Sequence, residues 1–262
     1  MVDFEFREKY SSDDLVSVVR LLRSENGCPW DKEQTHASIR KDFIEEVCEV
    51  CEAIDEENPD MLREELGDVL LQVVFHSQIE AEKGVFDLGD VADGICKKLI
   101  LRHPHVFGDV HVESSAEVLT NWNNIKQTEK KQDSFTDTLT SVPKTLPALM
   151  KAQKIGSRAR RANMDFADAE AALRCMEEEI SELREAYASG DADRIADELG
   201  DVLFSAVNTA RHMNADAEEC LEKACSKFVS RFSKAEELIR LDGKAMTSLS
   251  IDELDAYWKK AK

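Results

Sequence analysis

Two groups of acidic residues repeat along this 262-residue chain at a constant offset. The string Glu-Leu-Gly-Asp-Val-Leu stands at residues 65–70 and again, letter for letter, at residues 198–203, an offset of 198 − 65 = 133 positions. A Glu-x-x-Glu pair precedes each copy, at residues 46–49 and 179–182, and these pairs keep the same offset. Because four acidic positions keep their spacing in both halves, the sequence predicts an internal duplication into two units of roughly 110–130 residues.

Each acidic group has the composition of a metal site. Residues three apart share one face of a helix, so each pair presents two carboxylates to one side. If the two helices of a unit pack antiparallel with these pairs facing, four carboxylates converge and repel one another unless a cation is bound. All donors are oxygen, which favours Mg²⁺, with Mn²⁺ as a substitute, over zinc. The predicted ligands are Glu46, Glu49, Glu65 and Asp68 in the first unit and Glu179, Glu182, Glu198 and Asp201 in the second.

The alternative for both groups is an ordinary solvated helix face. A lone Glu-x-x-Glu is usually that, but here Asp68 and Asp201 each stand directly before an apolar run, at 69–71 and 202–204. An acid at the edge of such a run is expected to face inward, where an unpaired charge is costly. Bound Mg²⁺ keeps positions for water and phosphate oxygens, so the chemistry predicted for the site is metal-assisted hydrolysis of a phosphoanhydride.

The elements that position these residues are predicted to be helices throughout. No segment shows sustained apolar–polar alternation, and Gly (10) and Pro (5) are few, so we expect an all-α fold of two tandem helical bundles. After a first apolar stripe at residues 15–22, the predicted helices cover 36–56, 59–83, 88–102, a segment from 114 onward, 147–161, 168–188, 191–214, 216–241 and 250–261. Asn58 with Pro59, and Ser250 with Glu253, are typical helix starts. The predicted domains are residues 1–128 and 146–262, joined by a polar linker at 129–145.

Composition limits the partners and the compartment. The formal net charge is −20, so the surface repels phosphate polymers and anionic lipids, and neither a nucleic-acid polymer nor a membrane is an expected partner. The longest nearly uncharged stretch is too short to span a bilayer, and the first residues lack the features of a signal peptide. The seven cysteines follow no disulfide framework, which predicts reduced thiols in the cytoplasm. Cys48 and Cys51, among glutamates in a helix, are predicted to be buried and unreactive.

These motifs together resemble a known family. Glu-Glu-x-x-Glu followed by Glu-Leu-Gly-Asp is similar to the signature of the all-α nucleoside triphosphate pyrophosphohydrolases. The tandem copies and the strings at 27–35 (GCPWDKEQT), 102–107 (RHPHVF) and 147–154 (PALMKAQK) resemble the MazG family itself, over nearly the whole chain. The resemblance implies Mg²⁺-dependent hydrolysis of nucleoside triphosphates to monophosphate and pyrophosphate, with broad nucleotide specificity. It also implies a homodimer and a housekeeping or stress-related role in a bacterial cytoplasm.

The resemblance assigns catalysis to the second unit, because MazG proteins are usually described as working through the C-terminal copy. Its catalytic residues would be the four predicted ligands there together with Glu178. Either Glu178 or Glu182 could orient or deprotonate the attacking water, and the sequence does not choose between them.

A second set of residues in the same unit is predicted to bind the nucleotide. Lys223, Lys227 and Arg231 stand four apart on one helix face, a cationic stripe suited to a triphosphate, although ordinary surface charge is the alternative. Trp258 could stack a base without reading its identity, or could be a packing residue. Asn208, on the helical face of Asp201, could contact sugar, base or phosphate. Arg194 completes the set.

Two other functions remain open from the sequence. One is a narrower enzyme of the same class, such as a dUTP, dCTP or phosphoribosyl-ATP pyrophosphatase. The other is a non-catalytic helical scaffold that binds a metal ion or a partner protein.

Overall fold

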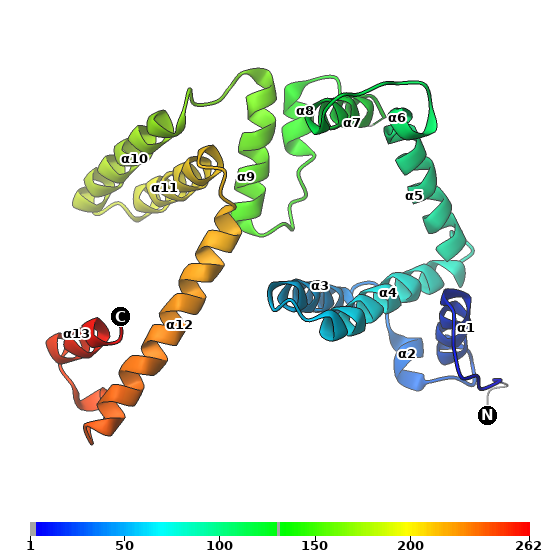
Figure 1. The fold of residues 1–262 in the computed structure, drawn as a ribbon, viewed down its shortest axis with the longest axis horizontal. Coiled ribbons are helices and arrows are strands. Elements are labelled where there is room, and N and C mark those ends of the chain that lie inside the picture. The colour runs from blue at the N-terminus through cyan, green and yellow to red at the C-terminus, as the bar shows by residue number, and fades with distance from the viewer. Residues whose placement is uncertain (1–3, 130–131) are drawn as a thin grey trace. The chain divides into compact units, whose positions relative to one another are not determined.

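The computed structural model describes residues 4–129 and 132–262, and every regular element within them is a helix (Figure 1). The prediction of an all-α fold with a tandem duplication is therefore confirmed. The chain divides into two compact units, Met1–Lys126 and Gln127–Lys262. None of the described helices is both long and apolar enough to cross a bilayer.

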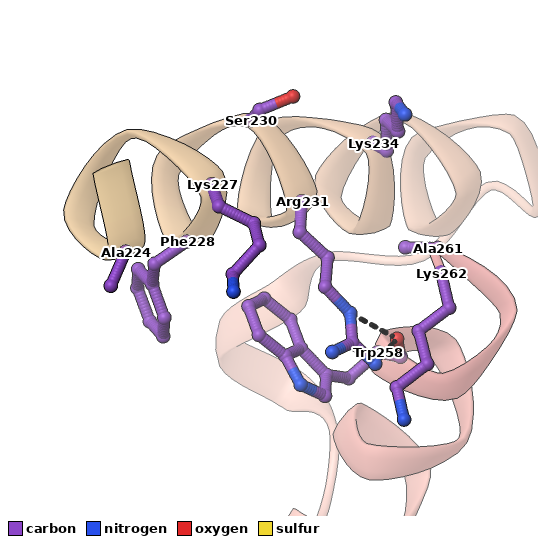
Figure 2. Close-up of a pocket in the computed structure, with 9 residues that line it drawn as sticks. All are labelled: Ala224, Lys227, Phe228, Ser230, Arg231, Lys234, Trp258, Ala261 and Lys262. Carbon is purple, nitrogen blue, oxygen red and sulfur yellow. Dashed lines mark hydrogen bonds between the residues drawn. The ribbon is translucent and has the colours of Figure 1, made fainter. Parts of the chain in front are cut away.

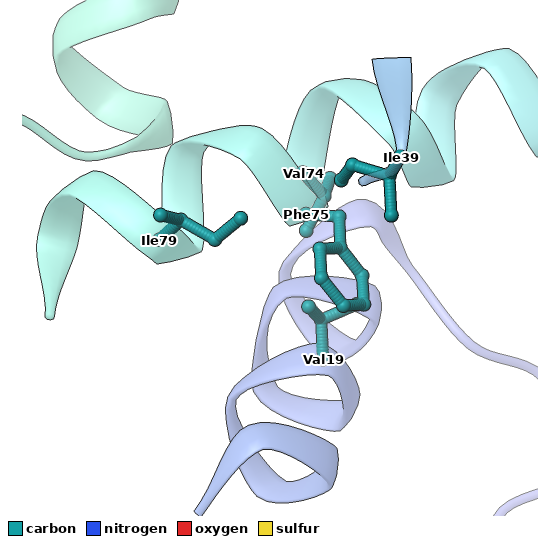
Figure 3. Close-up of a cluster of buried hydrophobic side chains, with 5 residues drawn as sticks. All are labelled: Val19, Ile39, Val74, Phe75 and Ile79. Atoms are coloured by element: carbon teal, nitrogen blue, oxygen red, sulfur yellow. The ribbon is translucent and has the colours of Figure 1, made fainter. Parts of the chain in front are cut away.

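The first unit is built around the two packed helices that carry its acidic motifs, as predicted from the sequence. Its helices are α1 (Ser12–Arg23), α2 (Pro29–Glu33), α3 (Arg40–Asp55), α4 (Pro59–Ala81), α5 (Leu88–Arg102), α6 (Pro104–Phe107) and α7 (Ser115–Glu129), the last running on past the boundary. α3 packs along α4, and α1 also packs on α4. The buried core lies where α1 and α4 meet, and Figure 3 shows its side chains.

The second unit repeats this arrangement. Its helices are α8 (Phe135–Thr140), α9 (Ala148–Ala159), α10 (Ala169–Ser189), α11 (Ala192–His212), α12 (Ala217–Leu241) and α13 (Ile251–Lys260), with short 3₁₀ turns at Arg160–Ala162 and Met246–Ser248. α10 packs along α11, and α9 packs on α11 and on α12. α13 folds back on α12 through a small core of Ala235, Ile239, Tyr257 and Ala261.

Most helix boundaries follow the local signals in the sequence. The Asn58 side chain accepts a hydrogen bond from the backbone N–H of Met61 at 3.2 Å, with Pro59 in the first turn. Ser250 and Glu253 form the predicted capping box of α13. Both predictions are confirmed, because each cap satisfies backbone N–H groups that a helix leaves unpaired at its start.

Three short helices were not predicted. α2, α6 and α8 have five, four and six residues, too few for a periodic apolar stripe to be recognised. α8 lies inside the segment predicted to be the linker and packs on α9. The predicted domain limits, 1–128 and 146–262, stay a prediction.

The burial predicted for two thiols is wrong. Cys48 and Cys51 are exposed and all seven cysteines are free within the part of the chain described. The face of α3 that carries Glu46, Glu49 and the buried Ala53 is the less exposed one. One helix turn has 3.6 residues, so positions 48 and 51 fall outside that face.

Candidate functional site

Helices α10 and α11 bring the predicted acids of the second unit together. Glu179 and Glu182 of α10 and Glu198 of α11 each offer a carboxylate oxygen, and these atoms lie within 4.8 Å of one another. Burial raises the pKa of Glu179, and the negative charges of Asp201, Glu182 and Glu198 raise it further. Three of the four predicted ligands thus converge, and the charge of the fourth, Asp201, also acts on Glu179.

Helices α3 and α4 build a cluster of the same composition in the first unit. Carboxylate oxygens of Glu46, Glu49 and Glu65 lie within 4.8 Å of one another. Burial raises the pKa of Glu46, followed by the charges of Asp68, Glu49 and Glu65. Burial and Glu49 likewise raise the pKa of Glu65. The duplicated spacing in the sequence therefore corresponds to a duplicated cluster in space.

Both clusters have the donor set of a divalent-cation site. Their donors are carboxylate oxygens from two packed helices, and hard divalent cations such as Mg²⁺ and Mn²⁺ prefer oxygen ligands. After burial, the negative charges of neighbouring carboxylates are what raise the pKa values of Glu46, Glu65 and Glu179. A bound cation would relieve this repulsion, so the residues fit such an ion.

Two predicted residues lie at the edge of the second cluster. Glu178 is exposed on α10, next to Glu179 in the chain, and is not one of the three converging carboxylates. Arg194 Nε lies 3.6 Å from a carboxylate oxygen of Glu198. Arg194 therefore sets a positive charge against one side of the cluster.

One thiol contact in this cluster was not predicted from the sequence. The Cys175 Sγ lies 3.7 Å from Glu179 Oε1, one helical turn earlier on α10. Burial and the charge of Glu179 raise the pKa of this thiol, so it stays protonated and donates to the carboxylate. The spacing of four between the two residues was the available signal.

A cavity of about 470 Å³ adjoins the second cluster. Its wall includes Glu179 and Asp201 at the cluster, and Asn208 and Arg211 further along α11. Asn208 is buried, as expected for a residue on the inner face of α11. The structure therefore brings Asn208 into the same cavity as two of the predicted ligands.

An ion-pair network at the end of this cavity was not predicted from the sequence. Asp165 accepts hydrogen bonds from Nη1 and Nη2 of Arg211, the first at 3.0 Å, and from Nε2 of His212 at 2.8 Å. The Arg211 guanidinium, the largest cause, holds the pKa of Asp165 far below its usual range. The partners are about 46 residues apart in sequence, a separation that no local pattern reveals.

The predicted cations of α12 lie at a different cavity. Lys227, Arg231 and Trp258 line a cavity of about 450 Å³ between α12 and α13 (Figure 2). Arg231 donates from Nε and Nη2 to the backbone carbonyl of Trp258, at 2.9 and 2.6 Å, and its guanidinium lies 4.2 Å from the centre of the indole ring. Trp258 is half-buried and packs against the small core of α12 and α13. Lys223 lies one turn before Lys227 on α12 and forms an ion pair with Glu219, with 3.2 Å between Nζ and Oε2.

The two cavities of the second unit share none of their lining residues, as far as the described chain shows. The predicted nucleotide-binding residues therefore fall into two groups. Arg194 and Asn208 lie at the acid cluster or in its cavity, whereas Lys227, Arg231 and Trp258 form a separate surface with Lys223 nearby.

Comparison with known proteins matches both clusters to one family. The sequence model of the MazG nucleotide pyrophosphohydrolase domain matches residues 34–107 and 167–235, whose starts are also 167 − 34 = 133 positions apart. A Thermotoga maritima protein named nucleoside triphosphate pyrophosphohydrolase/pyrophosphatase MazG is 46% identical over 250 residues, 95% of each chain. The Escherichia coli K12 nucleoside triphosphate pyrophosphohydrolase is 42% identical over 253 residues, 95% of this chain and 96% of that one. Bacillus subtilis YabN is 44% identical over 94% of this chain and 50% of its own length.

Proposed function

The chain belongs to the MazG nucleotide pyrophosphohydrolase family, and on this basis we propose that it hydrolyses nucleoside triphosphates to monophosphate and pyrophosphate at the acid cluster of its second unit. The observation that carries the proposal is the convergence of Glu179, Glu182 and Glu198 within the matched segment 167–235. The relatives named for this activity match almost end to end, which supports the same reaction here.

The cluster would hold Mg²⁺, or Mn²⁺ in its place, through Glu179, Glu182, Glu198 and Asp201. A bound cation of this kind supplies Lewis-acid polarisation of phosphate oxygens and offsets their negative charge. Glu46, Glu49, Glu65 and Asp68 would bind the same ion in the first unit. The negative charges of neighbouring carboxylates raise the pKa values of Glu46 and Glu179, so a cation bound at either cluster would be favoured.

The other residues of the site have roles that their positions allow. Glu178 or Glu182 would orient the attacking water and accept its proton. Arg194, already 3.6 Å from Glu198, would contact a phosphate at the edge of the cluster. Asn208 would contact the nucleotide inside the adjoining cavity.

The surface between α12 and α13 is the second part of the proposal. Lys223, Lys227 and Arg231 would offset charge on the triphosphate and on the leaving pyrophosphate, and Trp258 would contact the nucleotide. Variants of these residues test this surface independently of the acid cluster.

A homodimer and a cytoplasmic location also belong to the proposal. Free thiols fit a reducing compartment.

A pyrophosphate-release assay tests the function directly. The common ribo- and deoxyribonucleoside triphosphates are each offered to the full chain with and without Mg²⁺. We expect Mg²⁺-dependent release of pyrophosphate from several of them. Release from a single nucleotide would identify a narrower enzyme, and metal binding without any release would identify a non-catalytic scaffold.

A further inference from the structure

The acid clusters of the two units differ at three positions that border them. The offset of 133 that relates the clusters also pairs these bordering residues, and each stands four residues from a predicted ligand of its unit. A spacing of four places two side chains on the same face of a helix, so each bordering residue stands beside its ligand. The pairs, with the first unit named first, are Met61 and Arg194, Asp42 and Cys175, and Gln72 and Ser205.

The first difference is a positive charge. In the second unit the Arg194 Nε lies 3.6 Å from Glu198 Oε1, so a guanidinium stands against the cluster. The first unit has the uncharged Met61 at this position, half-buried on α4. Among the described residues, no lysine or arginine forms an ion pair with the four acids of the first cluster. Since a positive charge opposes the binding of a cation beside it, Arg194 weakens the second cluster for a divalent ion.

The second difference is a hydrogen-bond donor. The Cys175 thiol donates to Glu179 Oε1 at 3.7 Å and so competes with a metal ion for an oxygen of a predicted ligand. In the first unit Asp42 takes this place, four residues before Glu46. An ionised carboxylate accepts hydrogen bonds and donates none, so Asp42 adds negative charge near the cluster and leaves the oxygens of Glu46 to the ion.

The third difference is an oxygen atom without a hydrogen-bond partner. Gln72 Oε1 on α4 is buried and accepts no hydrogen bond from the residues that the structure describes. Side chains of a helix lean toward its N-terminus, so that of Gln72 leans over the turn that carries Asp68. At the equivalent position the Ser205 hydroxyl donates to the backbone carbonyls of Asp201 and Val202, at 3.0 and 3.2 Å. Amide oxygens are accepted ligands of hard divalent cations, and only the first cluster has one at this position.

We propose that the first cluster is the tighter divalent-cation site of the protein, with Gln72 Oε1 as a further ligand, and that the second cluster binds its ion more weakly when no substrate is bound. The class of ion rests on the proposed function. All three differences act in the same direction, because each gives the first cluster either less positive charge or more oxygen. A scarce divalent ion would therefore fill the first unit before the second.

Titration with Mn²⁺, followed by the electron paramagnetic resonance signal of the free ion, tests the order of the two affinities. Glu182→Gln leaves the first cluster intact, and Glu49→Gln leaves the second intact. Without nucleotide, we expect the Kd of the first cluster to be at least about tenfold lower than that of the second. The measurement involves no turnover, so it still applies if the chain hydrolyses nothing and the proposed function fails.

Exchanging one bordering pair tests the cause of the difference. Met61→Arg, made in the Glu182→Gln protein, should raise the Kd of the first cluster for Mn²⁺ about tenfold, because it introduces the charge that the second unit has there. Arg194→Met, made in the Glu49→Gln protein, should lower the Kd of the second cluster by a similar factor.

Variants of Gln72 test its role as a ligand. In the Glu182→Gln protein, Gln72→Leu should raise the Kd of the first cluster about tenfold or more, and Gln72→Glu, which keeps an oxygen, should not. Thr209→Val is the matched control, because Thr209 Oγ1 is also buried without a partner in the described chain but lies in the second unit. It should leave the Kd of the first cluster unchanged. In EDTA, Gln72→Leu and Thr209→Val should each melt at or above the temperature of their parent, since each removes an unpartnered buried oxygen.

Two results would overturn the inference. One is a Kd for Mn²⁺ at the second cluster that is equal to or lower than that at the first. The other is a pair of folded proteins, Met61→Arg and Gln72→Leu, that both bind Mn²⁺ at the first cluster as tightly as their parent.

Discussion

Replacing Glu182 by Gln should make the metal-free protein more stable and the enzyme inactive. The Glu182 carboxylate lies within 4.8 Å of those of Glu179 and Glu198. Gln keeps the length of the side chain and removes its charge, so two repulsive pairs disappear without a cavity. The same change removes a predicted metal ligand, so hydrolysis should fall by about two orders of magnitude or more.

The size of the stability gain follows from the distance. Two unit charges 4.8 Å apart repel by about 0.9 kcal/mol at the dielectric constant of water, the appropriate value because Glu182 is exposed. Two such pairs, partly screened by salt, give about 1–2 kcal/mol. For a domain of this size, that gain raises the melting temperature by roughly 2–8 °C.

Differential scanning calorimetry in EDTA and then in Mg²⁺ measures the gain. Mg²⁺ should stabilise the wild type, by about 2.7 kcal/mol at a hundred times its Kd, and should stabilise Glu182→Gln much less. A variant that melts at or below the wild-type temperature in EDTA, and that gains as much from Mg²⁺ as the wild type, would refute the idea of a repulsive cluster that a cation relieves.

Three further predictions follow from the two units. Glu49→Gln, at the position equivalent to Glu182, should keep most pyrophosphate release; a loss as large as that of Glu182→Gln would show that the first cluster is also used. Asp165→Asn should lower the free energy of unfolding by about 3–5 kcal/mol at pH 7, since it leaves Arg211 unpaired. The folded-state pKa of Asp165 lies below its ordinary 3.8, so the difference in unfolding free energy between wild type and variant is complete above about pH 4 and shrinks as the pH falls further. Urea titrations at several pH values would reveal this change. Burial and the neighbouring His36, whose Nδ1 lies 2.7 Å from that of His76, lower the pKa of His76 below 6.5. The unfolded chain therefore binds more protons, and the first unit should lose stability as the pH falls below 6.5. His76→Gln should flatten this dependence of stability on pH, and an unchanged dependence would contradict the prediction.

Much of the fold could be predicted because its signals are local. The caps at Asn58 and at Ser250 lie within three residues of the groups that they bind, and the predicted span of α5, 88–102, equals the observed Leu88–Arg102. Short helices and the exposure of Cys48 could not be predicted in the same way. The first have too few residues for a period, and the second depends on which face of α3 meets α4.

The sequence by itself determined the duplication, the all-α class and the three acids that converge in each unit, because identical residues at one offset on predicted helices leave few other arrangements. It could not determine that Lys227 and Arg231 share a cavity with Trp258 rather than with Glu179. Nor could it show that Gly156 faces Asn208 while Arg23 covers Phe75. A cavity is the space left by side chains from helices far apart in the chain, so which residues line it depends on how these helices pack.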